Sequence, residues 1–302
     1  MLDSSKIQQF ADIAILIPTI NESTLEEVVR AARSEMPGAE IVITGFGDAR
    51  FIADKYQGTF LDLKEKTRKS IALNRAIQST KKNKFIVLDA DAIPQKGWGE
   101  AMQQELDCNR LFTCRVDISC GNYWMRAYNL SMLHTFATQK KNETAEYIPL
   151  FCTGFTREVY ERIGPISDYL DRGQDYEWSL RARLLGVSPA YLPLPVVQHK
   201  PILKTTLKDL WNYWVETGKA NLQIRLMYPQ IVKTPRILLS PYFLLFFLPV
   251  LAMIASLRII SQSTKVVLQN IDLLPAVFLS KIAYCVGFFQ FALTRSAKGR
   301  YD

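Results

Sequence analysis

The segment "FIVLDADAIP", residues 85–94, decides the fold and raises the functional question. Its apolar start is typical of a buried strand that leads straight into Asp89 and Asp91, and we expect Pro94 to end the strand. Side chains two residues apart in an extended strand point the same way, so the two carboxylates should lie together. Such a pair repels itself unless a cation or hydrogen bonds hold it. Mg²⁺ or Mn²⁺, bound with substrate phosphates, meets that need, and a solvated turn is the alternative.

Strand and helix patterns alternate around this segment. Apolar strands are predicted at 13–18, 40–45, 59–63 and 84–91, and helices at 23–38, 48–58 and 66–80. Ser23 and Glu26 have the spacing of a capping box at the start of the first helix. Apolar strands separated by helices indicate a doubly wound, mostly parallel α/β sheet that is covered on both faces.

Beyond Cys120 the pattern becomes more helical, with a strand-like stretch at 147–152 and a helix at 177–186. In a parallel sheet, ligands bind beyond the carboxyl ends of the strands. The segments "PTINES" (18–23) and "DADAIP" lie at two of these ends. We therefore expect a binding site there.

Charge and composition restrict the partners. The 302 residues are 48% apolar and have a formal net charge of +8, which favours phosphates, nucleotides or an anionic membrane surface. We expect no nucleic acid partner. Two histidines and the absence of a CxxC pair argue against a Cys/His zinc site.

The C-terminal part has two long apolar segments. Residues 237–257 are uncharged and would reach roughly 30 Å as a helix, the thickness of a bilayer core. Residues 271–293 are nearly as apolar but contain Lys281. We predict a helical membrane hairpin, which Pro241, Pro249 and Pro275 would kink. A helix in the membrane plane and a buried helical pair in a soluble protein are the alternatives.

The two apolar segments also predict the domain boundary and the side of the membrane on which the catalytic domain lies. We predict a catalytic domain over 1–235 and a membrane-associated hairpin with a basic tail over 236–302. Arg295, Lys298 and Arg300 follow the second segment, and the positive-inside rule places such residues in the cytosol. The expected localisation is the cell membrane, with the catalytic domain facing the cytoplasm.

Five motifs occur in order between residues 13 and 225: "ILIPTINE", "KSIALNRAI", "DAD", "CTGFTREVYERIGPISD" and "GQDYEWSLRARLLG". Together they resemble the family 2 glycosyltransferases, which are inverting enzymes with the GT-A fold. The resemblance implies a pocket for the nucleotide of a sugar donor, to which it assigns Thr19, Asn21, Glu22, Lys69, Asn74 and Asp89.

The resemblance also assigns the chemistry. Asp89 and Asp91 would hold Mg²⁺ or Mn²⁺ and the diphosphate, and His199 would approach the metal. Asp175 would be the catalytic base, although Gln174 replaces the acid that usually precedes it. Without the resemblance, a negative charge that the helix N-terminus favours is the preferred interpretation of Asp175.

Two departures from the family pattern concern specificity. Gly45 stands where an acid that contacts the base is expected, so Asp48 is the candidate substitute and the choice of UDP or GDP is open. The absence of a QxxRW motif argues against a processive polymer synthase.

The leading hypothesis is a metal-dependent inverting transferase that glycosylates a hydroxyl of a lipid-linked or cell-surface glycan. A polyprenyl-phosphate acceptor and a catalytically inactive membrane-anchored scaffold are the alternatives. A sugar nucleotidyltransferase would need a glycine-rich loop after the first strand, and "PTINES" has no glycine.

Overall fold

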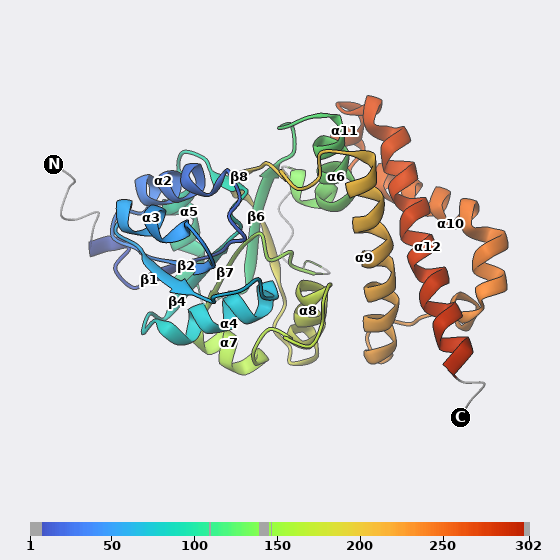
Figure 1. The fold of residues 1–302 in the computed structure, drawn as a ribbon, viewed down its shortest axis with the longest axis horizontal. Coiled ribbons are helices and arrows are strands. Elements are labelled where there is room, and N and C mark those ends of the chain that lie inside the picture. The colour runs from blue at the N-terminus through green and yellow to red at the C-terminus, as the bar shows by residue number, and fades with distance from the viewer. Residues whose placement is uncertain (1–7, 109, 139–144, 146, 299–302) are drawn as a thin grey trace. The chain divides into compact units, whose positions relative to one another are not determined.

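The computed structural model describes residues 8–108, 110–138, 145 and 147–298 (Figure 1). By its internal contacts the chain forms two compact units. The first unit consists of Met1–Asp117, Gln139–Tyr169 and Gln174–Ile202. The second unit consists of Ile118–Thr138, Leu170–Gly173 and Leu203–Asp302. The second unit thus begins well before the predicted domain boundary at residue 235.

The first unit is built on one eight-stranded sheet with the strand order β3-β2-β1-β4-β7-β6-β8-β5. The strands are β1 (Ile13–Pro18), β2 (Glu40–Gly45), β3 (Thr59–Asp62), β4 (Lys84–Leu88), β5 (Ala92–Pro94), β6 (Phe112–Asp117), β7 (Cys152–Thr156) and β8 (Ala190–His199). Strands β1 to β4 are parallel, as predicted, and β6 runs parallel to β8. The pairs of β7 with β4 and β6, and of β5 with β8, are antiparallel. The predicted mostly parallel α/β sheet is confirmed.

Helices cover both faces of this sheet (Figure 1). Helices α2 (Leu25–Glu35), α3 (Ala49–Lys55) and α5 (Trp98–Leu106) lie on one face, and α4 (Lys69–Ser79) and α7 (Arg157–Ile163) lie on the other. Helix α2 buries Leu25, Val28, Val29 and Ala32, which share one side at helical spacing.

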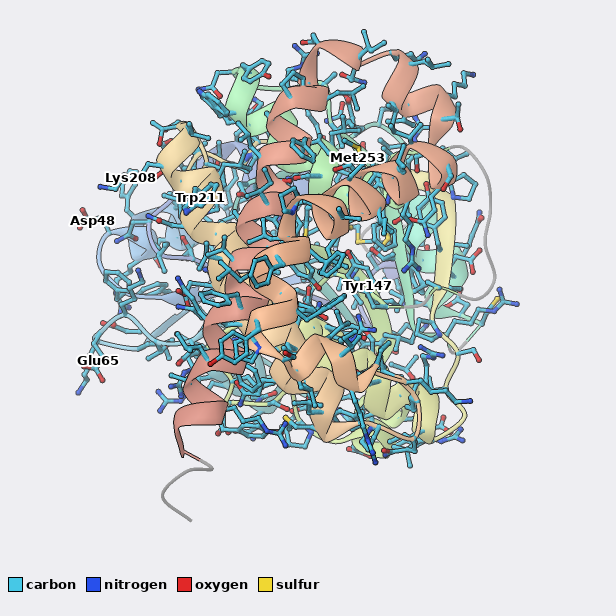
Figure 2. The ribbon with its side chains drawn as sticks, turned by 90° about the vertical axis from the view of Figure 1, so that its right-hand side faces the viewer. Asp48, Glu65, Tyr147, Lys208, Trp211 and Met253 are labelled. Carbon is cyan, nitrogen blue, oxygen red and sulfur yellow. The ribbon has the colours of Figure 1, made fainter. Side chains whose placement is uncertain are left out.

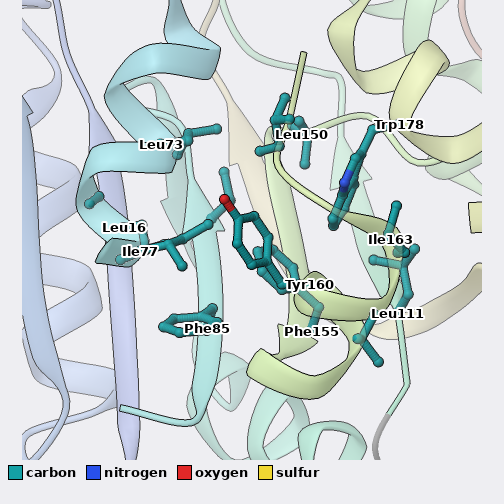
Figure 3. Close-up of a cluster of buried hydrophobic side chains, with 14 of the residues drawn as sticks. Leu16, Leu73, Ile77, Phe85, Leu111, Leu150, Phe155, Tyr160, Ile163 and Trp178 are labelled. Atoms are coloured by element: carbon teal, nitrogen blue, oxygen red, sulfur yellow. The ribbon is translucent and has the colours of Figure 1, made fainter. Parts of the chain in front are cut away.

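A second set of buried side chains joins α4, α7 and α8 (Gln174–Leu184) to the sheet (Figure 3). Trp178 of α8 packs edge-on against Phe155 of β7, with ring centroids 5.2 Å apart. Phe155 also packs against Phe85 of β4. Because this cluster ties α8 to the middle of the sheet, it holds the N-terminal end of α8 in place.

Three local predictions were wrong. Strand β4 ends at Leu88, so Asp89 and Asp91 lie in a turn and Pro94 ends β5 instead. The N-cap of α2 is Thr24, without the predicted capping box, because the Thr24 hydroxyl donates to the Ala90 carbonyl at 2.7 Å. The strand expected at 147–152 begins only at Cys152.

The second unit is helical. Its elements are α6 (Tyr123–Leu133), η1 (His134–Ala137), α9 (Leu207–Met227), η2 (Arg236–Leu239), α10 (Pro241–Gln262), α11 (Thr264–Leu268), η3 (Ile271–Leu273) and α12 (Leu274–Lys298). Helices α9 and α12 pack backbone to backbone through two glycines. A Cβ atom on Gly218 would lie 2.1 Å from the Tyr284 carbonyl oxygen, and one on Gly287 would lie 2.1 Å from that of Val215. Only glycine permits this approach.

Two helices of the second unit are long and apolar enough to cross a membrane, judged by length and composition alone: Pro241–Gln262 and Ile271–Arg295. The most apolar stretch of 18 residues differs in burial between the two helices: 22% of this stretch is buried in the first helix and 50% in the second. Most of α10 therefore presents apolar side chains outward, including Phe246, Ile254 and Met253, which is labelled in Figure 2. Of the basic tail, Arg300 lies outside the described residues.

Lys281, in the middle of α12, is buried within the second unit. Its ammonium donates to the Ser131 carbonyl at 3.0 Å and lies 3.7 Å from the centroid of the Trp214 ring. The protein itself therefore satisfies this charge through a hydrogen bond and a cation–π contact. The sequence showed only that the lysine interrupts the apolar segment.

Candidate active site

The turn after β1 is closed by one carboxylate. Glu22 accepts hydrogen bonds from the Thr19 hydroxyl at 2.6 Å and from the Ile20 amide at 2.8 Å. The Thr19 hydroxyl oxygen in turn accepts the Asn21 amide at 3.0 Å. Asn21 adopts a left-handed conformation with φ 67° and is exposed. Thr19 and Glu22 therefore give this strand end a defined polar edge.

The end of β2 lies directly against this turn. The Thr19 amide donates to the Thr44 carbonyl at 2.9 Å, and a Cβ atom on Gly45 would come within 2.5 Å of the Thr19 carbonyl oxygen. A side chain at position 45 would thus collide with β1. This close approach explains why no acid stands there.

The two aspartates lie in the turn between β4 and β5. The Ala92 amide donates to the Asp89 carbonyl at 3.0 Å, and the Asp89 amide donates to Phe151 at 2.8 Å. The Thr24 hydroxyl donates a hydrogen bond to the carbonyl of Ala90, the residue between the two aspartates. Asp89 and Asp91 thus meet in one pocket through a bonded turn rather than an extended strand end.

Lys69, the first residue of α4, reaches the same turn. Its ammonium contacts Asp89 Oδ1 and donates a hydrogen bond to the Leu150 carbonyl. Burial raises the pKa of Asp89 to about 6, because desolvation disfavours the carboxylate. Lys69 opposes this rise, while the like charge of Asp91 adds to it.

His199, the last residue of β8, is buried beside the second aspartate. Its Nε2 atom lies 3.4 Å from Asp91 Oδ1, and its ring lies 5.8 Å from that of Phe151. The antiparallel pairing of His199 with Ala92 brings the imidazole to this turn. The structure thus brings together the two aspartates and the predicted histidine from distant parts of the chain.

These strand ends surround a pocket of about 220 Å³. Five of the predicted site residues line it: Thr19, Glu22, Lys69, Asp89 and Asp91. The remaining lining residues are Pro18, Ile20, Gly45, Phe46, Leu63, Thr67, Ala72 and Ala90. The lining therefore combines apolar side chains at the ends of β1, β2 and β3 with the polar Thr19 and Glu22, and its charged end is formed by Lys69 and the aspartates.

The other predicted residues lie outside this lining. Asp48 is exposed at the start of α3 (Figure 2). The Asn74 amide makes three protein contacts: it donates to the Ile166 carbonyl at 2.7 Å and accepts from the Ile166 amide and the Tyr160 hydroxyl, both at 3.0 Å. In this structure Asn74 thus anchors the loop after α7.

Asp175 is the second residue of α8 and does not line the pocket. Its Oδ1 atom accepts the Tyr176 amide at 2.8 Å, so its negative charge lies at the N-terminal end of the helix. Ser179, one helical turn after Asp175, donates a hydrogen bond from its hydroxyl to the Asp175 carbonyl. The same hydroxyl oxygen accepts a hydrogen bond from the Ile148 amide.

The most deeply buried carboxylate of α8 is Glu177, which the sequence analysis did not single out. Glu177 is 1% exposed, accepts the Ser167 hydroxyl, and pairs with Arg181 at 2.7 Å. Arg181 also donates to the Ile163 and Pro165 carbonyls, at 3.0 and 2.7 Å. This ion pair therefore joins α8 to the loop after α7.

The pocket suits a divalent metal ion that is bound jointly with phosphates. Two carboxylates and an imidazole are donors that Mg²⁺ and Mn²⁺ accept, and Mg²⁺ is often held by one or two carboxylates plus substrate phosphates. Among the described residues, no group of three or more His, Cys, Asp and Glu side chains is arranged to hold a metal. The predicted ligands Asp89, Asp91 and His199 are therefore not preassembled as a complete set.

Sequence reasoning missed several residues of the pocket. Leu63 is the last residue of the third predicted strand and Thr67 follows it, and the rule that ligands bind at the carboxyl ends of strands could have found both. Outside the lining, the Leu150 carbonyl that accepts the Lys69 ammonium could not be found from the sequence, because any residue type supplies a backbone acceptor.

Comparisons with known proteins agree with this architecture. A model of the family described as glycosyl transferase family 2 matches residues 14–164. No curated protein matches the chain.

Solved structures with a similar fold include a mannosyltransferase from Pyrobaculum calidifontis in complex with GDP-Man and Mn²⁺. Its TM-score is 0.61 at 15% identity, over 93% of this chain and 87% of that chain. Another is the glucosyl-3-phosphoglycerate synthase from Mycobacterium tuberculosis, with a TM-score of 0.51 at 14% identity, over 72% of this chain and 82% of that chain. At these identities the likeness concerns the fold.

Proposed function

Because the chain belongs to glycosyl transferase family 2, a family whose model spans half of its residues, we propose that it is a membrane-associated, metal-dependent glycosyltransferase. It moves a sugar, with inversion, from a UDP- or GDP-linked donor to a hydroxyl of a lipid-linked or cell-surface glycan. The predicted GT-A fold and transferase class agree with the family and with the solved structures.

One observation supports this proposal above the others: Lys69, Asp89 and Asp91 converge at the charged end of a pocket formed by strand ends. The leaving group of a nucleotide sugar is a diphosphate, which needs cations at the point where its charge develops. Lys69 supplies one cation directly. The aspartates would hold the other, with His199 beside Asp91.

The residues divide the chemistry between them. A bound divalent ion would act as a Lewis acid on the diphosphate. Glu22 and Thr19 shape the turn against which the nucleotide lies, and Gly45 lets β2 approach this turn closely. We assign to the Asp175 carboxylate the role of general base, which accepts the proton of the attacking hydroxyl in a single displacement.

A donor screen tests the function. The full-length protein, in detergent, is incubated with a panel of UDP- and GDP-sugars, with Mg²⁺, with Mn²⁺, or with a chelator. We expect hydrolysis or transfer from at least one donor only when the metal is present. Absence of both turnover and nucleotide binding across the panel would favour the inactive scaffold.

The variant Asp175→Asn tests the base and the acceptor class together. With a hydroxyl acceptor we expect a loss of about 10²–10⁴-fold in turnover, because general-base catalysis contributes that much. Donor affinity, measured by calorimetry, should stay nearly unchanged. A polyprenyl phosphate is already ionised and needs no base, so a mild effect with that acceptor would identify the alternative reaction.

We also propose that the second unit attaches the enzyme to the cell membrane, with the catalytic domain facing the cytoplasm. The support is the outward apolar surface of α10 and the exposed Arg295 near the end of α12. Protease protection in membrane vesicles of known orientation checks the sidedness. Digestion of the first unit only from the cytoplasmic face is the expected result.

A further inference from the structure

We infer that Lys69 is a movable cation: a divalent metal ion must displace it from Asp89, and the nucleotide diphosphate assists by giving Lys69 a new partner. The inference rests on the proposed function, because it assumes that the metal and the diphosphate share the pocket. It predicts that the metal and the nucleotide bind with positive coupling.

Lys69 is held by two groups next to the aspartate turn. Its ammonium contacts Asp89 Oδ1 and donates to the Leu150 carbonyl. The residue after Leu150, Phe151, accepts the Asp89 amide through its own carbonyl. The ammonium therefore lies against the Asp89 carboxylate, which together with Asp91 would hold a metal.

The position of Lys69 in α4 is electrostatically unfavourable. It is the first residue of the helix, after the N-cap Arg68, and a helix N-terminus carries a partial positive charge that disfavours cations. Residues that contradict a local rule in this way are often functional. The side chain remains 37% exposed, and its flexible four-carbon stem can change partners without moving the helix.

The electrostatics of the pocket set the order of events. An ammonium and a divalent ion on one carboxylate repel each other at short range in a partly buried site. Binding of the metal alone therefore costs the ion pair between Lys69 and Asp89. When a diphosphate binds together with the metal, Lys69 pairs with a phosphate oxygen instead, and the cost is offset. By linkage, each ligand then raises the affinity for the other.

A fixed structural ion pair would behave differently. If Lys69 only held Asp89 in place, its removal would loosen the aspartate turn and weaken metal binding. The two roles therefore predict opposite changes in the affinity for a metal ion offered without nucleotide.

The experiment uses the full-length protein in detergent micelles and measures free Mn²⁺ by electron paramagnetic resonance, without nucleotide and with saturating GDP or UDP. For the wild-type protein we expect the nucleotide to tighten Mn²⁺ binding about tenfold, within the usual range of coupling between sites. For Lys69→Met we expect Mn²⁺ alone to bind about tenfold more tightly than to the wild type, and the coupling to fall to about twofold or less.

Lys66→Met is the matched control, because Lys66 is an exposed lysine just before α4 that does not line the pocket. It should behave as the wild type does. An equal gain in Mn²⁺ affinity from Lys66→Met, or no gain from Lys69→Met, would overturn the inference. Lys69→Arg, which keeps the charge, provides a second test if Lys69→Met does not fold, and it should retain the weak binding of Mn²⁺ alone.

The outcomes separate this inference from the proposed function. If the wild-type protein binds neither Mn²⁺ nor a nucleotide, the proposed function fails. If it binds Mn²⁺ and the nucleotide, but neither ligand raises the affinity for the other, the proposed function stands and the inferred change of partner by Lys69 is wrong.

Discussion

At the scale of single residues, Asp89 at the charged end of the pocket is a partly buried carboxylate, and its neighbours Lys69 and Asp91 shift its pKa in opposite directions. Asp89 has a raised pKa because burial outweighs its pairing with Lys69, and Asp91 adds repulsion. The folded protein therefore holds a proton at Asp89 more tightly than the unfolded chain does. This carboxyl costs stability once it is ionised.

The pH dependence of stability follows from that shift. Between the ordinary value of 3.8 and about 6, the folded state binds more protons at Asp89 than the unfolded state, so the free energy of unfolding falls as pH rises. A shift of this size corresponds to about 3 kcal/mol. Denaturant titrations from pH 4 to 7 should show this loss in the wild type and not in Asp89→Asn.

The control is Asp54→Asn, which removes an exposed carboxyl of α3. Its profile should follow the wild type. A constant difference between the wild type and Asp89→Asn over this pH range would show that Asp89 titrates as an ordinary aspartate.

At the scale of elements, close backbone contacts decide which helices and strands can be neighbours. Gly45 lets β2 approach the turn after β1, and Gly218 and Gly287 let α9 and α12 meet. The capping prediction at Ser23 failed for a related reason: the Thr24 hydroxyl bonds a carbonyl 66 residues away rather than its own helix. Local spacing cannot reveal such a partner.

Gly218→Val tests the packing of α9 on α12. The added side chain would meet the Tyr284 carbonyl, and overpacking of this kind costs about 1–3 kcal/mol. We expect a lower melting temperature in detergent by circular dichroism. Lys208→Ala, at an exposed position of α9 (Figure 2), should leave it unchanged. Equal melting temperatures for both variants would contradict the close helix contact.

At the scale of the whole molecule, the candidate pocket and the candidate membrane helices lie in different compact units. Every residue that lines the candidate pocket belongs to the first unit, and both candidate membrane helices belong to the second. Nucleotide binding and membrane attachment should therefore be separable by mutation.

The double variant Phe246→Asp with Ile254→Asp tests this separation. Both side chains are exposed on α10, at 78% and 59%, and each aspartate would cost roughly 2.5–3.5 kcal/mol in a bilayer core. We expect the protein to move from the membrane pellet to the soluble fraction, with nucleotide affinity within about twofold of the wild type, since neither residue lines the pocket. Leu194→Asp, at an exposed apolar position of β8, is the control and should remain in the pellet. Retention of the double variant in the pellet would show that α10 is not the lipid contact.

The sequence alone determined the parallel half of the sheet, the place of Asp89 and Asp91 directly after the apolar run of β4, and the apolar character of α10. These features depend on periodicity and on short-range chemistry, which are readable along the chain. Only the tertiary structure decided the antiparallel strands β5 and β7, the pairing of Lys69 with the Leu150 carbonyl 81 residues away, and the contact of Asn74 with Ile166 92 residues away. It also decided that Ser131, 150 residues away, satisfies Lys281. The physical reason is that each of these partners is a backbone group or a distant side chain, which is brought into reach only when the whole core packs.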